Sequence, residues 1–231
     1  MRLWYPRTYR TEHIMATVSS SVGPSVVLTN VTWGTYERLV DDLADSSAPR
    51  LTYDREVLEI MSPTPEHERL NRMLSDLIGA TAEELDIDTE NLGSSTFKRE
   101  DLERGFEPDS CLYVQNAARV RAQSRLDLSV DPAPDLVIEI DITSASIEKL
   151  PIYALVGVPE VWRYDGSTLR LMKLEGKEYV LTDFSPAFPL LTAKVLEGFL
   201  DKSMSMRRPE LLKAFRAWIR KSVSSSTKPA E

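Results

Sequence analysis

Cysteine and histidine are scarce in this chain: among 231 residues there is one cysteine, Cys111, and there are two histidines, His13 and His67. A single cysteine cannot form an intramolecular disulfide, and the Cys/His spacing of a structural zinc site is missing. A bound metal would therefore be held by oxygen atoms, which favours magnesium or manganese over zinc. A cysteine nucleophile is not expected either, because Cys111 has no histidine partner.

Long hydrophobic runs are also missing. No apolar segment approaches the roughly 18 residues needed to cross a bilayer, so we expect no membrane association. Residues 1–25 include several charged side chains and no continuous apolar segment of the kind found in secretory signals. We expect these residues to be disordered, with Met15 as an alternative start, and we expect a cytoplasmic protein.

Positive charge is in short supply, with 28 Lys and Arg against 36 Asp and Glu and a net charge of −8. Nonspecific nucleic-acid binding depends on cationic surface, so this balance argues against a protein that coats nucleic acid. An enzyme with a local basic strip remains compatible with it. The basic clusters fit either a binding strip or ordinary solvated surface: Lys98, Arg99 and Arg104; Arg119, Arg121 and Arg125; and the cations between residues 207 and 221.

The hydrophobic pattern predicts one α/β domain over residues 26–221. Helical spacing and capping residues predict helices at 33–43, from 65 onward, and near 146–156, 192–202 and 209–220. Alternation and turn residues predict a hairpin at 50–61 and strands near 91–98, 107–114, 135–142, 160–164, 168–174 and 178–182. This order is typical of a β-sheet flanked by helices. The Ser/Thr/Pro-rich tail, residues 222–231, is expected to be disordered.

Carboxylates occupy informative positions on two of the predicted strands. In the segment 135–142, apolar side chains alternate with Glu139 and Asp141, which therefore point to the opposite face. By the same rule Glu107 and Asp109 share one face of their strand. A buried ionised carboxylate costs several kcal/mol unless it is paired or bound to metal. One divalent ion between the strands would neutralise two of these acids; exposed strand ends or arginine partners are the alternative.

Four segments carry a further pattern: EIMSP at 59–63 followed by His67, GFEPD at 105–109, DPAPDLVIEI at 131–140 followed by Ser144, and YALVGVPEVW at 153–162. In this order they resemble the Uma-two family of endonucleases, over roughly residues 30 to 200. The resemblance implies the restriction-endonuclease-like fold of the PD-(D/E)XK superfamily, a central mixed β-sheet flanked by helices. It also implies a metal-dependent endonuclease that hydrolyses phosphodiester bonds in DNA.

The resemblance assigns roles to particular residues. In that superfamily an Asp after a Pro and an acid on the next strand bind the metal, here Asp109 and Glu139 with Mg²⁺ or Mn²⁺. A lysine usually follows two residues after the second acid, but this chain has Asp141 there, which is a candidate third ligand. We expect Lys149, on the following helix, to replace that lysine, with Lys98 as the alternative.

His67 lies near the start of the helix predicted from residue 65 onward, on the side that faces the core. It is a candidate to orient substrate or to shuttle a proton, because a histidine pKa lies near neutrality; the alternative is that it satisfies backbone groups near the helix start.

Other functions stay open at this point. Asp141 in the lysine position and the acidic net charge favour a catalytically degenerate nuclease-fold protein that acts as a binding or assembly module. A third hypothesis is a two-carboxylate hydrolase acting on a neutral substrate such as a sugar. The apolar side of the helix that carries Leu211, Phe215 and Trp218 either serves a homodimer interface or packs on its own core.

Overall fold

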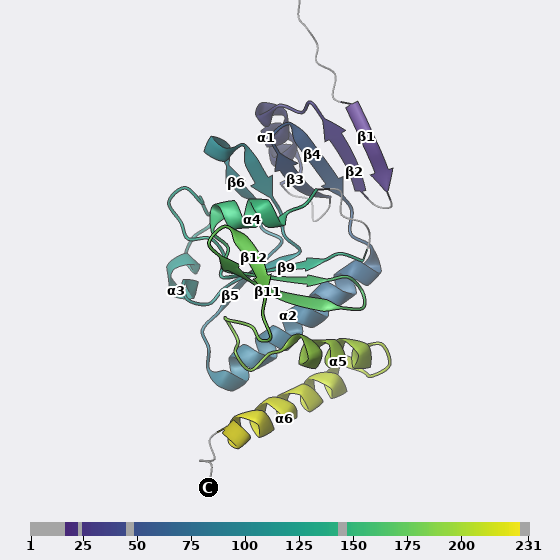
Figure 1. The fold of residues 1–231 in the computed structure, drawn as a ribbon, viewed down its shortest axis with the longest axis vertical. Helices are drawn as coiled ribbons and strands as arrows, with labels where there is room; N and C mark the ends of the chain where they lie inside the picture. Colours follow the sequence, from purple (N-terminus) through teal and green to yellow (C-terminus); the bar gives the residue numbers. More distant parts are fainter. Residues whose placement is uncertain (1–16, 23–24, 45–48, 143–146, 227–231) are drawn as a thin grey trace, which may run out of the picture.

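The structure is a computed structural model of the chain, which describes residues 17–22, 25–44, 49–142 and 147–226 (Figure 1). In chain order the elements are β1 (Thr17–Val22), β2 (Ser25–Thr29), α1 (Trp33–Asp42), β3 (Arg50–Asp54), β4 (Val57–Met61), α2 (Pro65–Leu85), β5 (Glu90–Gly93), β6 (Phe97–Arg99), the 3-10 turn η1 (Glu100–Leu102), β7 (Arg104–Phe106), β8 (Ser110–Tyr113), α3 (Ala117–Val120), β9 (Leu136–Ile140), α4 (Leu150–Val156), β10 (Glu160–Tyr164), β11 (Leu169–Glu175), β12 (Glu178–Leu181), α5 (Ala193–Ser203) and α6 (Arg208–Ser226).

The central sheet has the strand order β12-β11-β10-β9-β8-β5. It is mixed, because β9 and β10 run parallel while the other neighbours run antiparallel. Side chains alternate along β9, so that Leu136, Ile138 and Ile140 pack in a core with α2, α5 and α6, whereas Val137 packs in a second core on the side of α4. The predicted α/β sheet with flanking helices is therefore confirmed.

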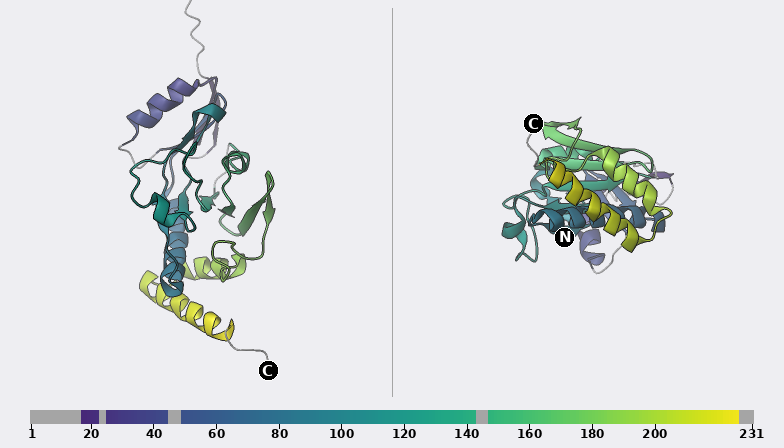
Figure 2. Two further views of the ribbon diagram at one scale, coloured as in Figure 1. Left: turned by 90° about the vertical axis from the view of Figure 1, so that its left-hand side faces the viewer. Right: turned by 90° about the horizontal axis from the view of Figure 1, so that it is seen from below.

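A second sheet, which we call the N-terminal sheet, has the strand order β1-β2-β4-β3-β7-β6. Helix α1 covers its outer face (Figure 2), where Leu51, Tyr53 and Leu58 are buried. The opposite face turns toward the central sheet and carries polar side chains that are nonetheless buried: Ser25, Arg50, Thr52 and Glu59. The register aligns Thr52 with Glu59 across β3 and β4. A sheet face of this composition predicts a polar site in the space that it borders.

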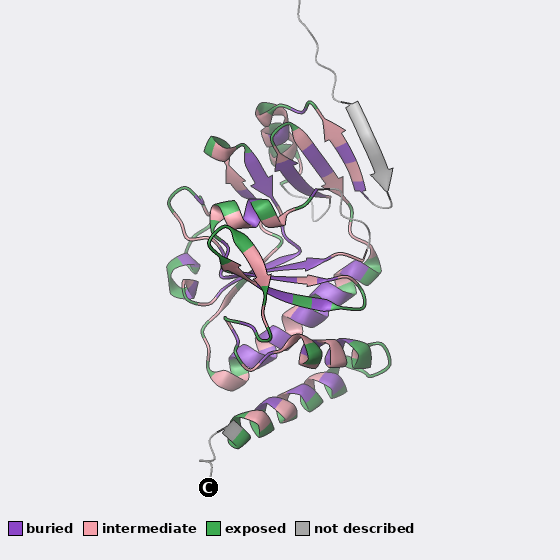
Figure 3. Cartoon of the chain, in the orientation of Figure 1, coloured by how far each residue is buried: buried purple, intermediate pink, exposed green. Residues whose placement is uncertain are grey.

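Helix α2 begins as the sequence predicts. Thr64 is its N-cap and accepts a hydrogen bond from the backbone N–H of His67, and Pro65 occupies the first turn. The helix buries its apolar stripe against the central sheet (Figure 3) and so holds its N-terminal end between the two sheets.

The apolar side of helix α6 packs on the chain's own core, which is the second of the two alternatives that the sequence left open. Leu211, Phe215 and Ile219 are fully buried, and α6 contacts α2 and α5. On the surface Arg220 forms an ion pair with Glu84 of α2. None of the helices in the described ranges combines the length and the apolarity required to span a bilayer.

The structure differs from the expectation at both ends of the chain and in the number of sheets. Residues 17–22 form a strand, because β1 pairs with β2 through backbone hydrogen bonds; residues 1–16 lie outside the described residues. Helix α6 continues to Ser226, with the hydroxyls of Ser224 and Ser225 bonded back to backbone carbonyls of the preceding turn, and residues 227–231 lie outside the described part.

Candidate metal and active site

Asp109 lies immediately before strand β8, opposite Glu139 of the neighbouring antiparallel strand β9. Ser110 of β8 pairs with Ile138 of β9, and one further step along this register brings Asp109, immediately before β8, opposite Glu139. Both side chains are buried, with 1% and 4% of their surface exposed. The structure thus brings together the two acids that the sequence singled out.

The Asp109 carboxylate is held on several sides. Its Oδ2 accepts a hydrogen bond of 2.7 Å from the backbone N–H of Ile140 and lies 3.0 Å from Nε2 of His67. Its Oδ1 faces the guanidinium of Arg50, with which it forms an ion pair. The backbone carbonyl of Asp109 accepts a hydrogen bond from Nδ2 of Asn71 on α2, at 2.8 Å. The orientation of this carboxylate is therefore fixed by both sheets and by α2.

The Glu139 carboxylate is held by the start of α4. The ammonium of Lys149, the residue that caps this helix, lies 2.9 Å from Oε2, and the hydroxyl of Tyr153 donates a hydrogen bond to Oε1. Lys149 and Tyr153 are four residues apart and so share one helical face. Burial, together with the negative charge of Glu139, raises the pKa of Tyr153 well above its usual value, so the hydroxyl keeps its proton and acts as a donor.

His67 sits against Asp109, but its pKa is not near neutrality as we expected. Burial, followed by the nearby charges of Arg50 and Lys149, lowers the pKa of His67 to about 4. The sequence places His67 on the inward side of α2 but does not reveal these two cationic neighbours. The imidazole packs 3.0 Å from the carboxylate, but among the described residues neither of its ring nitrogens forms a hydrogen bond.

Asp141 borders the site, but its carboxylate pairs with the guanidinium of Arg163 at 2.7 Å. Arg163 also contacts Glu148, at 3.0 Å. Asp141 therefore already has a cationic partner, which weakens the case for it as a third metal ligand.

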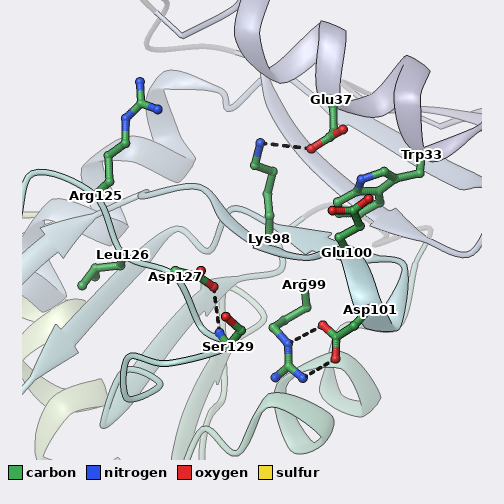
Figure 4. Close-up of a pocket in the computed structure, with 10 residues that line it drawn as sticks. All are labelled: Trp33, Glu37, Lys98, Arg99, Glu100, Asp101, Arg125, Leu126, Asp127 and Ser129. Carbon is green, nitrogen blue, oxygen red and sulfur yellow. Dashed lines mark hydrogen bonds and ion pairs between the residues drawn. The ribbon is translucent and has the colours of Figure 1, made fainter.

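Lys98 lies elsewhere. Its ammonium is 3.6 Å from the Glu37 carboxylate of α1, and both residues line a separate cavity of about 610 Å³ beside Trp33 (Figure 4). Of the two lysines that the sequence left as alternatives, the structure brings only Lys149 to the paired acids.

Glu107 does not share a strand face with Asp109, because β8 begins only at Ser110. The carboxylate of Glu107 instead accepts hydrogen bonds from the backbone N–H of Leu51, at 2.9 Å, and from the hydroxyl of Thr96, at 2.6 Å. Its role here is to link the N-terminal sheet to the segment before β6.

Asp109, Glu139 and Lys149 line a small cavity of about 30 Å³, which is large enough for an ion or a water molecule. Its titratable lining residues are Arg50, Glu59, His67, Asp109, Glu139, Asp141 and Lys149. Within the described part of the chain no cluster of three or more His, Cys, Asp or Glu side chains is arranged to hold a metal. Two adjacent carboxylates nevertheless fit Mg²⁺, which proteins commonly bind through one or two carboxylates while water and substrate phosphate fill the other positions.

Sequence reasoning missed two residues of the site, Arg50 and Tyr153. Arg50 was assigned to the hairpin 50–61 without a role, although its alternation with Leu51 and Tyr53 indicates an inward position. The spacing of Tyr153 from Lys149 carried the corresponding signal for α4.

Comparisons with known proteins concern the family of the chain rather than the geometry of the site. The model of the Uma2 family, described as "Putative restriction endonuclease", matches residues 33–205. Among solved structures, a "putative nuclease belonging to DUF820" from Anabaena variabilis ATCC 29413 is similar with a TM-score of 0.49 and 17% sequence identity, covering 70% of this chain and 98% of the other. Comparison with curated proteins finds no match. The family match confirms the resemblance carried by the four sequence segments.

Proposed function

The chain belongs to the Uma2 family of restriction-endonuclease-like nucleases, and on this basis we propose that it is a metal-dependent endonuclease that hydrolyses phosphodiester bonds in DNA. The observation that supports the proposal most strongly is the buried pair of Asp109, immediately before β8, and Glu139 on the adjacent strand β9, with the ammonium of Lys149 at 2.9 Å from Glu139. Two metal-binding acids and one lysine are the side chains that this chemistry requires.

Asp109 and Glu139 would hold Mg²⁺ or Mn²⁺. When bound, such an ion polarises the scissile phosphate, lowers the pKa of a water molecule and offsets negative charge on the leaving oxygen. The backbone N–H of Ile140 keeps the Asp109 carboxylate in one orientation, and Tyr153 does the same for Glu139. A ligand pair that is fixed before the ion arrives needs little reorganisation during the reaction.

Lys149 takes the role of the lysine that usually follows two residues after the second acid, where this chain has Asp141. Its ammonium has three N–H donors, and the contact with Glu139 uses one of them, so the others can orient a water molecule or a phosphate oxygen. In the hydrolysis the attacking water gives up one proton to solvent as its oxygen forms the new bond to phosphorus. The bond from phosphorus to the leaving sugar oxygen breaks, and that oxygen takes up a proton from solvent.

The pairing of each acid with a cation favours a second candidate function, a binding or assembly module that has lost catalysis. Asp109 contacts Arg50, and Glu139 contacts Lys149, so both acids are neutralised by side chains of this chain. A degenerate site of this kind would keep its fold without any metal.

Cleavage of supercoiled plasmid DNA distinguishes the two functions. Purified protein is incubated with Mg²⁺, Mn²⁺ or EDTA, beside the near-isosteric variants Asp109→Asn and Glu139→Gln. Glu160→Gln is a matched control, because Glu160 is an equally buried glutamate on the neighbouring strand β10, bonded to Trp162 and outside the site. We expect nicking with either ion that EDTA and the two site variants abolish and that Glu160→Gln retains.

Metal-dependent cleavage that survives in Asp109→Asn and Glu139→Gln would refute the assignment of these ligands. Absence of cleavage by folded wild-type protein, on plasmid as well as on a single-stranded RNA of the same sequence, would favour the binding module.

A further inference from the structure

Arg50 is a buried cation at the centre of the site. It opens strand β3, where its side chain points inward and only 6% of its surface is exposed. Its guanidinium forms ion pairs with Asp109 on one side and Glu68 of α2 on the other. Burial lowers the pKa of Arg50, but an arginine stays protonated in proteins, so its charge has to be balanced by anions nearby.

Arg50 and Asp109, which line the small cavity, also form part of the wall of a groove of about 440 Å³. Polar side chains line this groove, among them Asn71, Arg72 and Arg208. Asn71 is buried, and its Oδ1 has no hydrogen-bond partner within the structure. A polar strand that lies in this groove would reach Asp109 with the guanidinium of Arg50 directly beside it.

A metal ion and Arg50 compete for the same carboxylate. Once Asp109 binds an ion, Arg50 keeps one ion pair among the described residues, with Glu68, and the more distant charges of Glu139 and Glu107. The Glu68 side chain is 29% exposed and also faces Arg72 at 3.7 Å. Taking one partner away from a buried ion pair is unfavourable, because the remaining charge loses part of its compensation. Binding of the ion alone is therefore opposed by Arg50, and an incoming anion next to Arg50 would remove the opposition.

We propose that Arg50 is the phosphate-binding residue of this site, paired with Asp109 in the absence of metal and transferred to a phosphodiester of the substrate when Asp109 takes the ion. The planar fork of a guanidinium suits both partners, since it binds carboxylate and phosphate oxygens in the same bidentate way. Metal and nucleic-acid strand then bind cooperatively, each raising the affinity for the other. The inference rests on the proposed nuclease function and adds to it that Arg50 leaves Asp109 for the phosphodiester when Asp109 binds the ion.

Calorimetric titration with Ca²⁺ tests this exchange without relying on activity, because Ca²⁺ takes the same oxygen ligands as Mg²⁺. The titration is made with and without a short DNA duplex for the wild type, Arg50→Met and Arg104→Met. Arg104 is a matched control: it is a buried arginine of the same sheet, 3.1 Å from Asp54 and outside the site. Thermal melting establishes that each variant is folded.

In the wild type and in Arg104→Met we expect the duplex to raise the affinity for Ca²⁺ by about tenfold or more, within the usual range of coupling between two sites. Arg50→Met should bind Ca²⁺ more tightly than the wild type without DNA, and the duplex should change this affinity by less than about twofold. Equal coupling in Arg50→Met and the wild type would overturn the proposal while leaving the nuclease function in place. A wild type that binds no Ca²⁺ under either condition would overturn both.

If Arg50→Met does not fold, Glu68→Gln decides the matter, because Glu68 is partly exposed and its removal leaves Arg50 present. Arg50 then depends more strongly on Asp109, so Ca²⁺ alone should bind more weakly and the effect of the duplex should grow. Unchanged values for both quantities would overturn the proposal.

Discussion

Replacement of Lys149 by methionine removes the ammonium from the site while keeping a long, flexible side chain. In the structure this ammonium lies 2.9 Å from Glu139, whose side chain is 4% exposed, while Lys149 itself is 14% exposed. Loss of a partner from a fully buried ion pair costs about 3–5 kcal/mol. Because Tyr153 still donates to Glu139 and water can reach the vacated position, we expect Lys149→Met to lower the free energy of unfolding by about 2 kcal/mol.

The effect on cleavage should be larger than the effect on stability. Removal of one preorganised hydrogen-bond donor from an active site typically lowers the rate by about 10²–10³-fold, and each tenfold loss corresponds to about 1.4 kcal/mol of transition-state stabilisation. The rate of plasmid nicking at saturating DNA, measured well below the melting temperature of the variant, should therefore fall about a hundredfold or more. Urea denaturation of the same preparation gives the stability change separately.

Lys98→Met is the matched control, because Lys98 forms only an exposed ion pair with Glu37 at 3.6 Å. Exposed pairs contribute about 0–1 kcal/mol, so both stability and nicking should stay close to those of the wild type. Nicking by Lys149→Met at the wild-type rate, or an equal loss in both variants, would refute the role given to Lys149.

Three further predictions concern other parts of the molecule. Tyr153→Phe removes a buried hydroxyl that donates to a carboxylate and should lower the free energy of unfolding by about 1–3 kcal/mol in urea denaturation; an unchanged value would contradict the contact. Burial raises the pKa of Glu160 above its usual value of 4.5, so its contribution to stability is present below that pH and is lost as pH rises through the folded pKa. Relative to Glu160→Gln, the wild type should lose stability as pH rises above 4.5, and parallel curves would be evidence against this. A methyl group at Gly105 would lie 2.0 Å from the Tyr36 hydroxyl, so Gly105→Ala should destabilise the protein by about 1–3 kcal/mol. Gly198 lies in helix α5 with open space around it, so Gly198→Ala should stabilise the protein by up to about 1 kcal/mol. Equal melting temperatures for the two variants would disprove this difference.

Local patterns in the sequence are sufficient to predict the helices and strands that have strong periodicity or clear capping residues. Thr64 and Pro65 mark the start of α2, and Gly157 ends α4 with a φ of 84°, a conformation that glycine adopts without strain. The N-terminal sheet could not be predicted as a separate layer. Its strands are short, and β1 in particular consists of the mixed segment TVSSSV, which becomes a strand because β2 supplies its backbone partners.

For the site, sequence reasoning identified the side chains with metal-binding chemistry but not the cations that neutralise them. The alternation along β9 and the family resemblance placed Asp109 and Glu139 together, and the structure agrees. The contact between Arg50 and Asp109 joins two different sheets, so no local spacing signals it. The lowered pKa of His67 depends on burial and on charges brought in from β3 and α4, and both of these arise only when the chain folds.

Binding of Mn²⁺, followed by electron paramagnetic resonance, tests most directly whether Asp109 and Glu139 form a metal centre. A titration of the wild type, in the presence of a DNA duplex, should show one tightly bound ion, and Glu139→Gln should lose it while Glu160→Gln keeps it. Equal binding of Mn²⁺ by the wild type and Glu139→Gln would contradict the assignment of the site.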